Sequence, residues 1–401
     1  MKKDDILRAA FTVWGKDLYR TTSLSDVARA LGVTKPALYR HFQNKGALME
    51  ALYEDFFDRY AAFLRGAVLP EEFSTLDKTE KIVRIVRTVA EYYLRHRSDF
   101  VFSCTMVLGN PQEEHGMAAE MNRRGFRMED LLSKDQRAYA EFFNHLAVMT
   151  AFFFVAQFHG SRASEEGEPS LEALAGAVDT IESLVRRGFG FKKEIVDRIP
   201  YGVLEQEGAK AADSVGETSE LMKAVAQAVA LAGPWNATME LVAQRSGLSK
   251  SGLYAHFRSK REMLRELFVS EFEKIAAMID SQGRLAEGPE ERLYRALVVT
   301  ADYLQSHPDI LIALDWIRIK RFDLGILIPD KILSVFEFSN RISTPVGLDS
   351  LTVAQWVMFL VVNFLMYGSK EKIEGKMEDQ GYPWGLRRLY RYITLGLEGW
   401  Q

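Results

Sequence analysis

The chain has 401 residues, with 51 Lys and Arg against 55 Asp and Glu, and therefore a formal net charge of −4. Its 47 % hydrophobic and 26 % charged residues exclude a disordered or collagen-like chain. The single cysteine, Cys104, excludes a disulfide framework and a cysteine-based zinc site.

The N-terminus and the apolar runs bear on the compartment. No apolar stretch follows Lys2 and Lys3, so a secretory signal is not expected. The longest clean apolar run, Leu146 to Ala156, is shorter than the roughly 20 residues that span a bilayer. We therefore expect a cytoplasmic protein without a membrane partner.

Helical periodicity recurs along the whole chain, whereas alternating strand patterns are nearly absent. Near the N-terminus, Ile6, Ala10, Val13 and Trp14 lie at the spacing of one helix face. Similar spacings return around residues 82–89 and 293–304. We predict an all-α fold.

The first short helices are predicted from their ends. Ser23 and Asp26 have the spacing of a capping box, which places a helix start near Leu24. Gly32 predicts the end of that helix, because glycine adopts the left-handed conformation without steric cost.

A second short helix follows at once. Thr34 is its expected N-cap and Pro36 lies in its first turn, while Asn44 is the expected cap of the helix after it. Two short helices joined by a tight glycine turn form a helix-turn-helix, whose second helix fits the major groove of DNA.

The same pattern returns 215 residues later. Eleven identical residues fall in register at this offset, and weaker matches continue at offsets of 210 and 209. The eleven are Val27, Ala28, Gly32, Lys35, Leu38, Tyr39, His41, Phe42, Lys45, Leu52 and Phe57, which match Val242, Ala243, Gly247, Lys250, Leu253, Tyr254, His256, Phe257, Lys260, Leu267 and Phe272. Each half is therefore predicted to hold a small helical unit followed by a larger bundle.

The predicted boundaries follow from this repeat. We expect helix-turn-helix domains at 1–48 and 219–263, larger regulatory domains at 49–201 and 264–401, and a linker at 202–218. The linker is predicted because that stretch is rich in Glu, Gly, Ala and Ser with little apolar periodicity.

Positive charge is concentrated in the small units. Residues 1–50 carry a net charge of +4 and residues 219–270 a net charge of +3, which leaves −11 for the rest of the chain. This distribution favours contact with nucleic acid in both places.

The repeated unit resembles the TetR/AcrR family of bacterial repressors. The resemblance rests on the stretches GVTKPALYRHFQNK at 32–45 and GLSKSGLYAHFRSK at 247–260. Members of that family usually contain one such unit and act as homodimers, so this chain resembles a fused TetR pseudo-dimer.

The resemblance implies double-stranded DNA as a partner and assigns positions that would touch it. Packing is the rival role for Tyr39 and Tyr254, and is the expected role of Phe42 and Phe257. The implied DNA-binding residues are Ser23, Leu24, Thr34, Lys35, Pro36, Ala37, Tyr39, Arg40, His41 and Lys45 in the first half, and Thr238, Met239, Ser249, Lys250, Ser251, Gly252, Tyr254, His256 and Lys260 in the second.

Because the two reading helices differ in sequence, we expect an operator with two unlike half-sites about one helical turn apart. Gly252 lowers helix propensity and has no side chain, so the second helix is expected to discriminate less.

The resemblance also implies a small-molecule effector, apolar or amphipathic, bound within the larger bundles. Core packing is the competing role for every candidate. The candidates are Phe102, Met106, Met117, Met121, Phe126 and Gln157 in the first half, and Trp316, Phe322, Trp356 and Asn363 in the second. By the same resemblance, the apolar helix around 142–154, its counterpart at 356–367, and the helices at 171–187 and 384–398 would form a bundle that joins the halves.

Other chemistry has little support in the sequence. No metal-binding, phosphate-binding or nucleophile motif is present, so we expect no enzyme, no cofactor and no metal. The predicted function is a DNA-binding transcriptional regulator, and more specifically a repressor released by an effector. The alternative is a TetR-like sensor or scaffold in which one or both helix-turn-helix units do not bind DNA. The chain would act as a monomeric pseudo-dimer or associate into a further homodimer.

Overall fold

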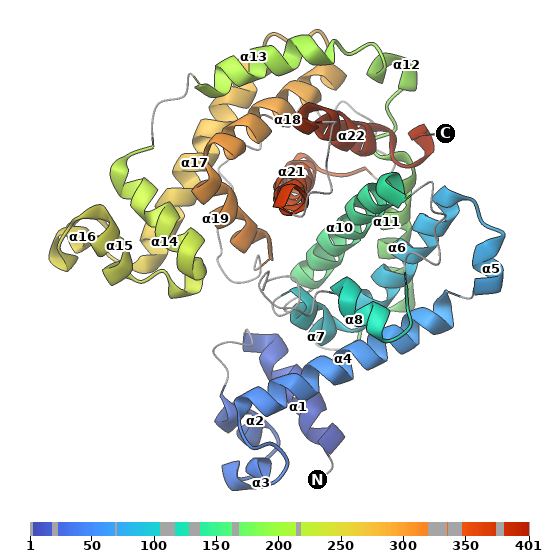
Figure 1. The fold of residues 1–401 in the computed structure, drawn as a ribbon, viewed down its shortest axis with the longest axis vertical. Coiled ribbons are helices and arrows are strands. Elements are labelled where there is room, and N and C mark those ends of the chain that lie inside the picture. The colour runs from blue at the N-terminus through green and yellow to red at the C-terminus, as the bar shows by residue number, and fades with distance from the viewer. Residues whose placement is uncertain are drawn as a thin grey trace. The chain divides into compact units, whose positions relative to one another are not determined.

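A computed structural model describes residues 3–17, 23–68, 70–104, 117–127, 137–162, 168–213, 218–319, 335, 347–373 and 381–400. Within these residues every regular element is a helix and there is no strand, as predicted (Figure 1). The chain divides into two compact units, Met1–Glu182 and Ser183–Gln401.

The first unit begins with three short helices beside the start of a long one. Helix α4 (Lys45–Ala67) starts at Asn44, whose Oδ1 accepts a hydrogen bond from the Ala47 N–H at 2.9 Å. Its buried residues recur every three or four positions, which fixes the face it turns inward. The other helices of this unit are α1 (Lys3–Asp17), α2 (Leu24–Ala30), α3 (Lys35–Tyr39), α5 (Pro70–Ser74), α6 (Lys78–Arg95), α7 (Arg97–Phe102), α8 (Met117–Arg123), α10 (Arg137–Ser161) and α11 (Leu171–Arg187), which runs across the division between the units.

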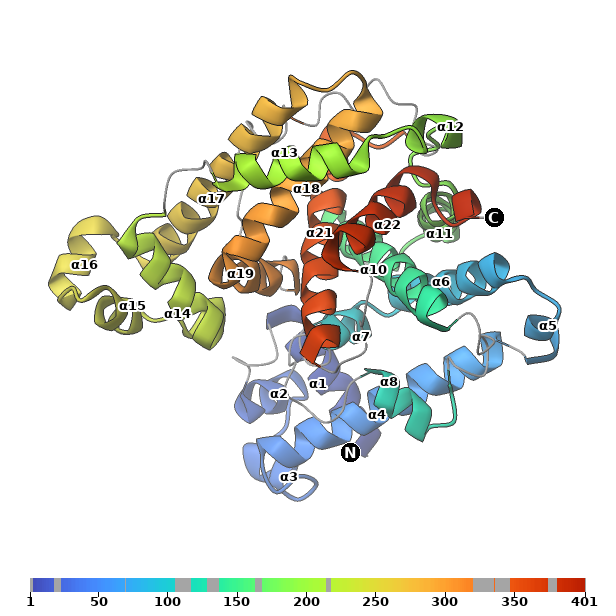
Figure 2. The same cartoon turned by 45° about the horizontal axis from the view of Figure 1, so that its top comes forward.

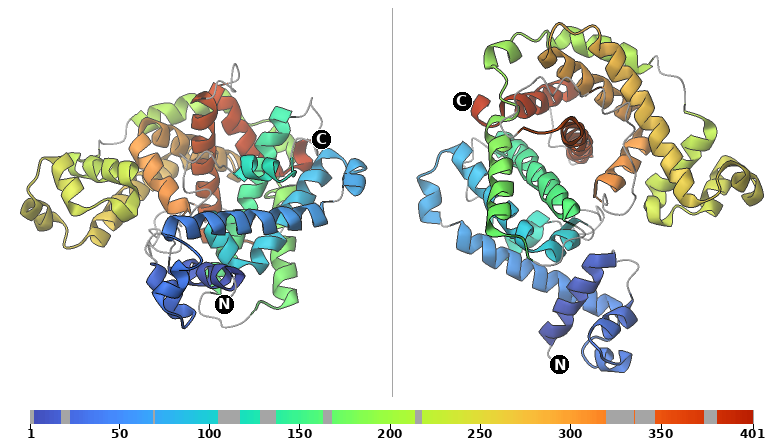
Figure 3. Two further views of the ribbon diagram at one scale, coloured as in Figure 1. Left: turned by 60° about the horizontal axis from the view of Figure 1, so that its bottom comes forward. Right: turned by 180° about the vertical axis from the view of Figure 1, so that it is seen from behind.

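The second unit repeats this order. Helix α17 (Lys260–Gly283) corresponds to α4, and the group α14, α15 and α16 lies at its start (Figures 1 and 2). Figure 3 shows the same group from two further sides. The helices of this unit besides α17 are α12 (Lys193–Val196), α13 (Tyr201–Asp213), α14 (Glu220–Asn236), α15 (Met239–Ser246), α16 (Lys250–His256), α18 (Pro289–Ser306), α19 (Pro308–Ile319), α21 (Ser350–Ile373), α22 (Gly381–Leu395) and the 3₁₀ helix η4 (Glu398–Trp400).

Each three-helix group is attached to its own bundle in the same way. In the first unit α1 packs against α2, α4 and α7, and in the second unit α14 packs against α15, α17 and α19. The first attachment is aromatic, with Phe102 of α7 edge-on to Phe11 of α1 at 5.3 Å between ring centroids. The repeat seen in the sequence is therefore also a repeat of packing.

The expected linker at 202–218 is wrong for most of its length. Residues 202–213 lie in α13, which packs on α18, and only residues 214–217 fall outside the described part of the chain. The small and acidic residues that suggested a linker serve this packing. Gly208 lies so close to α18 that an added Cβ would come within 2.3 Å of Val298.

Acidic residues of α13 are also paired within the second unit. Glu205 accepts two hydrogen bonds from Arg387 of α22, both at 2.7 Å, and one from the Tyr294 hydroxyl at 2.6 Å. Glu207 accepts one from Arg295 at 2.7 Å. Helix α13 is therefore a part of the second bundle, held there by both packing and charge.

The chain enters the second unit earlier than the expected boundary at residue 201. The Phe189 N–H donates to the Ile393 carbonyl at 2.8 Å, and the Phe191 N–H donates to the Thr394 carbonyl at 3.0 Å. Residues 183–201 therefore belong with the C-terminal helices rather than with the first regulatory domain.

One described helix has the length and apolar composition of a membrane span, at Phe142–Ser161. This stretch is longer than the apolar run Leu146 to Ala156, because it includes a few polar residues that leave its average hydropathy high. Most of it is buried, and it packs along α6 within the first unit. Those are the properties of the core helix of a helical bundle.

Candidate nucleic-acid interface

The first helix-turn-helix begins at a charged cap. The Asp26 carboxylate accepts hydrogen bonds from the Ser23 N–H at 2.9 Å and from the Ser23 hydroxyl at 2.7 Å. The second bond and the nearby Arg29 lower the pKa of Asp26, so the cap stays charged at neutral pH. The predicted start of this helix at Leu24 is confirmed.

Both turns depend on a left-handed glycine, as predicted. Gly32 has φ +64° and Gly247 has φ +70°, a region that residues with a Cβ rarely adopt. The N–H groups that follow return to the preceding helix, Val33 to the Ala28 carbonyl at 3.0 Å and Leu248 to the Ala243 carbonyl at 3.1 Å. These bonds fix the angle at which the second helix leaves the turn.

The second helices are anchored by their apolar sides. Leu38 and Phe42 are buried in the first unit, and Leu253 and Phe257 are buried in the second. The predicted core roles of Phe42 and Phe257 are thus confirmed.

The tyrosines behave differently. Tyr39 keeps 44 % of its surface exposed and Tyr254 keeps 46 %, so neither is a core residue. Their rings stand on the outer side of α3 and α16, where a nucleic acid is able to reach them.

Most other predicted DNA-binding residues also lie at the surface, with two exceptions. Leu24 and Met239 are buried, because each is the first apolar residue of a helix whose inner side packs on α1 or α14, which leaves their side chains to packing. Exposed residues are Ser23, Thr34, Lys35, Pro36, Arg40, His41, Thr238, Ser249, Lys250, Ser251 and His256, while Ala37, Lys45, Gly252 and Lys260 are partly buried.

The N-caps of α3 and α16 differ in detail. Thr34 and Ser249 both occupy the N-cap position. Only Ser249 uses its side chain, whose Oγ accepts a hydrogen bond from the Gly252 N–H at 3.0 Å. The Thr34 hydroxyl makes no cap bond, so it remains available on the exposed side of α3.

Helices α3 and α16 also differ in the charges around them. Lys35 of α3 lies over the Tyr39 ring at 6.0 Å, and Arg40 follows the helix. In the second unit Lys250 is ion-paired to Glu240 of α15, and the position equivalent to Arg40 is Ala255. Sequence reasoning missed this pair, because Glu240 and Lys250 are ten residues apart and on different helices.

The effector candidates are distributed over several environments. Phe102 is fully buried among Phe11, Tyr53 and Phe56, and Trp356 is fully buried against Phe189. The structure thus places both in aromatic cores. Asn363 is buried and Gln157 is half-buried. Met106, Phe322 and the side chain of Trp316 lie outside the described residues.

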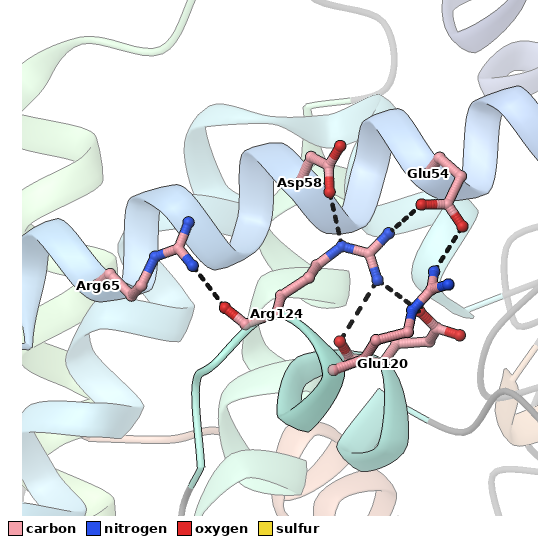
Figure 4. Close-up of polar contacts among 6 residues, drawn as sticks. Glu54, Asp58, Arg65, Glu120 and Arg124 are labelled. Carbon is pink, nitrogen blue, oxygen red and sulfur yellow. Dashed lines mark hydrogen bonds and ion pairs between the residues drawn. The ribbon is translucent and has the colours of Figure 1, made fainter.

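Three candidates lie on or just after α8. Met121 and Phe126 are buried and Met117 is half-buried. This segment is held on α4 by charge, as Figure 4 shows. Arg124 donates to Glu54 at 2.6 Å and to Asp58 at 2.7 Å, and it also pairs with the buried Glu120.

Further bonds complete the cluster between α8 and α4. Arg123 pairs with Glu54 at 2.5 Å and with Glu120 at 2.9 Å, and Arg65 of α4 donates to the Arg124 carbonyl. The Arg124 guanidinium lies over the Phe57 ring at 5.3 Å. In the sequence these residues look like the charged outer faces of helices, so only the tertiary structure reveals the cluster.

Within the described residues, no group of three or more His, Cys, Asp or Glu side chains is placed to hold a metal ion. The candidate site consists of two exposed helices, α3 and α16, which carry cationic side chains and pack on buried apolar residues.

Comparison with known proteins identifies these two stretches. The family described as "Bacterial regulatory proteins, tetR family" matches residues 6–52 and again residues 221–267. Both matches contain the helix-turn-helix just described and end early in the long helix that follows it.

Curated relatives match the chain over longer stretches, of 72 to 95 residues. They include the probable HTH-type transcriptional regulator YttP of Bacillus subtilis (strain 168), 27 % identical over 95 residues, which are 24 % of this chain and 45 % of the relative. They also include the HTH-type transcriptional repressor ComR of Escherichia coli (strain K12), 35 % identical over 72 residues, which are 18 % of this chain and 34 % of the relative.

A third relative is the HTH-type transcriptional repressor KstR2 of Mycolicibacterium smegmatis, 31 % identical over 75 residues, which are 18 % of this chain and 37 % of the relative. The matches thus cover between about a third and just under half of the length of these relatives.

Proposed function

Since the chain carries two TetR-family helix-turn-helix domains in tandem, we propose that it is a sequence-specific DNA-binding transcriptional regulator that acts as a repressor. The observation that carries this proposal is the pair of exposed reading helices, α3 and α16, each fixed on a buried base by Leu38 and Phe42 or by Leu253 and Phe257. Rigid placement of an exposed helix is what base readout in a major groove requires.

We further propose that one chain supplies both reading heads. A homodimer presents two identical helices and reads a palindrome, whereas the stretches around α3 and α16 differ at three exposed pairs, Thr34/Ser249, Pro36/Ser251 and Arg40/Ala255. The operator would then have two unlike half-sites, with centres about one helical turn apart. The two domains would work as an intramolecular pseudo-dimer.

Release by a small apolar or amphipathic effector is the regulatory part of the proposal. Support comes from α8, which carries Met117 and Met121 and is tied to α4 by Arg123 and Arg124. Helix α4 starts just after the reading helix α3, so a ligand that shifts α8 would shift α3 through α4. Such a ligand favours the conformation whose helix spacing does not fit DNA.

The experiment that tests the function is selection of bound sequences from random duplex DNA at physiological salt, with the mass of each complex measured. We expect an asymmetric site held by one chain. A palindrome held by two chains would contradict the pseudo-dimer but keep the regulator.

Absence of any enriched sequence would contradict DNA reading and favour a sensor or scaffold. A matched variant sharpens this outcome. Reversing the charge at Lys35 and Lys250 is expected to abolish selection if DNA is the target and to have no effect on a sensor or scaffold.

A further inference from the structure

Glu240 has no counterpart in the first helix-turn-helix. It lies in the first turn of α15, and the equivalent residue of α2 is Ser25. Its carboxylate pairs with the Nζ of Lys250, the first residue of the reading helix α16. Lys35, which is equivalent to Lys250, lies over the Tyr39 ring at 6.0 Å and has no acidic partner within the described residues.

The pair lies on the open surface of the domain. The side chain of Lys250 is 56 % exposed and that of Glu240 is 60 % exposed. The hydrogen bond to Lys250 lowers the pKa of Glu240, and the same bond raises the pKa of Lys250. Both groups are therefore charged at neutral pH and both are accessible to a nucleic acid.

A DNA phosphate that reaches Lys250 must also approach Glu240. The two side chains are in direct contact, and salt at 0.1 M screens charges only beyond about 10 Å. A phosphate bound to Lys250 is therefore close enough to be repelled by Glu240. The carboxylate thus occupies one donor of Lys250 and repels the incoming phosphate. The second reading helix also lacks a cation at Ala255, where the first has Arg40.

We propose that Glu240 is a specificity-determining residue of the second helix-turn-helix, which suppresses sequence-independent binding by competing with DNA phosphate for Lys250. This inference rests on the proposed DNA-binding function. The second domain then contributes little on random duplex and engages its half-site once the first domain is seated. Weakening the phosphate component in this way raises the ratio of specific to non-specific affinity.

The test is an exchange between the two halves. Glu240→Ser gives the second domain the residue of the first, and Ser25→Glu gives the first domain the acid of the second. Affinity is measured against salt concentration, both on random duplex and on the selected operator. Asp280→Ser is the matched control, because it removes an exposed carboxylate paired to Arg284 at 2.9 Å.

The control lies far from the reading surface. Asp280 is 20 residues beyond Lys260 along α17, which corresponds to about 30 Å of helix. Any effect of net charge alone would therefore appear in Asp280→Ser as well as in Glu240→Ser.

We expect Glu240→Ser to bind random duplex about three- to tenfold more tightly and to steepen the salt dependence by about one ion, with a smaller gain on the operator. Ser25→Glu should have the opposite effect. Asp280→Ser should match the wild type.

Two results would overturn the inference, and they differ. If the wild type binds DNA but Glu240→Ser leaves the salt dependence and the random-duplex affinity unchanged, Glu240 has no such role and the regulator remains. If neither the wild type nor any variant binds duplex DNA, the proposed function fails, and the inference fails with it.

Discussion

The helix that leads out of each helix-turn-helix carries a cation at the same position of the repeat, Arg59 in α4 and Lys274 in α17. Arg59 bonds Asp99 of α7 through two nitrogens, and Asp99 also accepts from the Tyr92 hydroxyl. Lys274 bonds Glu271 of its own helix at 2.8 Å, and Glu271 accepts from the Tyr303 hydroxyl.

The carboxylates therefore come from different elements. Asp99 links α4 to α7, whereas Glu271 replaces the apolar Phe56 of the first half and also faces Thr218, whose Oγ1 is 2.6 Å from the Lys274 Nζ. Both junctions contain a cation paired with a carboxylate where the small domain meets the bundle. The helix that supplies the carboxylate differs between them. The buried groups are the acids Asp99 and Glu271. A buried carboxylate requires a nearby cation and hydrogen-bond donors, and any arrangement of helices that brings them together satisfies that requirement.

The strongest way to break this comparison is Glu271→Ala. Glu271 is fully buried, so its loss leaves the Tyr303 hydroxyl without its acceptor and Lys274 without its acid. We expect the free energy of unfolding of the second unit to fall by about 3 kcal/mol. Denaturant titration measures this. Glu271→Gln is the matched control, because it keeps an acceptor for Tyr303, and equal losses for both variants would contradict the argument.

Asp99→Ala should have the next largest effect. It removes the bonds of Asp99 to Arg59 and Tyr92. Arg59 keeps its ion pair with Asp55 at 2.9 Å and 41 % of its side chain is exposed, so Asp55 and water replace part of the lost interaction. We expect a loss of about 2 kcal/mol in the first unit, seen as a lower melting temperature. Asp309→Ala, the same change at the equivalent position of α19, should stay within about 0.5 kcal/mol. A comparable loss there would show that this position, rather than its pairing, determines stability.

Arg40→Ala tests the charge difference between the reading helices. Arg40 is exposed and makes no ion pair within the described residues, so it is available for a phosphate or a base edge. We expect operator affinity to fall about tenfold, or about 1.4 kcal/mol. Ala255→Arg should raise it. Filter binding or fluorescence anisotropy measures both. Unchanged affinity in both variants would show that neither Arg40 nor the equivalent position 255 contacts DNA.

Arg124→Ala tests the attachment of α8 to α4, which the first unit builds from charge. The substitution removes bonds to Glu54 and Asp58 from a side chain that is only 9 % exposed. We expect about 1 kcal/mol of destabilisation and faster amide exchange at residues 117–127. Arg8→Ala, which breaks an exposed pair with Asp5 in α1, should leave that exchange unaltered. Unchanged exchange in Arg124→Ala would mean that the Arg124 bonds do not hold α8 on α4.

The smallest expected effect is a pH dependence confined to the first unit. The buried His159 of α10 donates from Nε2 to the Tyr93 carbonyl at 2.8 Å, and burial lowers its pKa below the ordinary value of 6.5. The unfolded chain therefore binds the proton first as pH falls below about 6.5, and stability declines until the folded-state pKa is reached. His159→Gln should flatten this part of the melting-temperature profile. A profile unchanged by the substitution would assign the titration elsewhere.

Local sequence patterns were enough for the helix-turn-helix units. Ser23 with Asp26, Gly32 and Gly247, and the caps Asn44 and Ser259 act on backbone groups within about four residues of themselves. Such signals do not depend on the rest of the fold. The repeat at offset 215 predicts the same signals in a second domain, and it indicates that each half has a small helical unit followed by a larger bundle.

Contacts between residues far apart in the sequence depend on how the helices pack, and local sequence patterns do not reveal them. The sequence of α13 predicts a linker, because small and acidic residues such as Gly208 and Glu205 are also common in flexible segments. In the structure Gly208 allows close packing on α18, and Glu205 pairs with Arg387 of α22. The pairing of Glu240 with Lys250 depends on the angle of the turn between α15 and α16.

The sequence by itself thus determined the helical class, the two reading helices and their caps, since these depend on near neighbours. The tertiary structure decided which charge meets which, from Asp99 with Arg59 to Arg124 with Glu54, because such pairs join helices far apart in the chain. Their partners are set by the packing of apolar faces, and the charged side chains then pair with whatever that packing brings within reach.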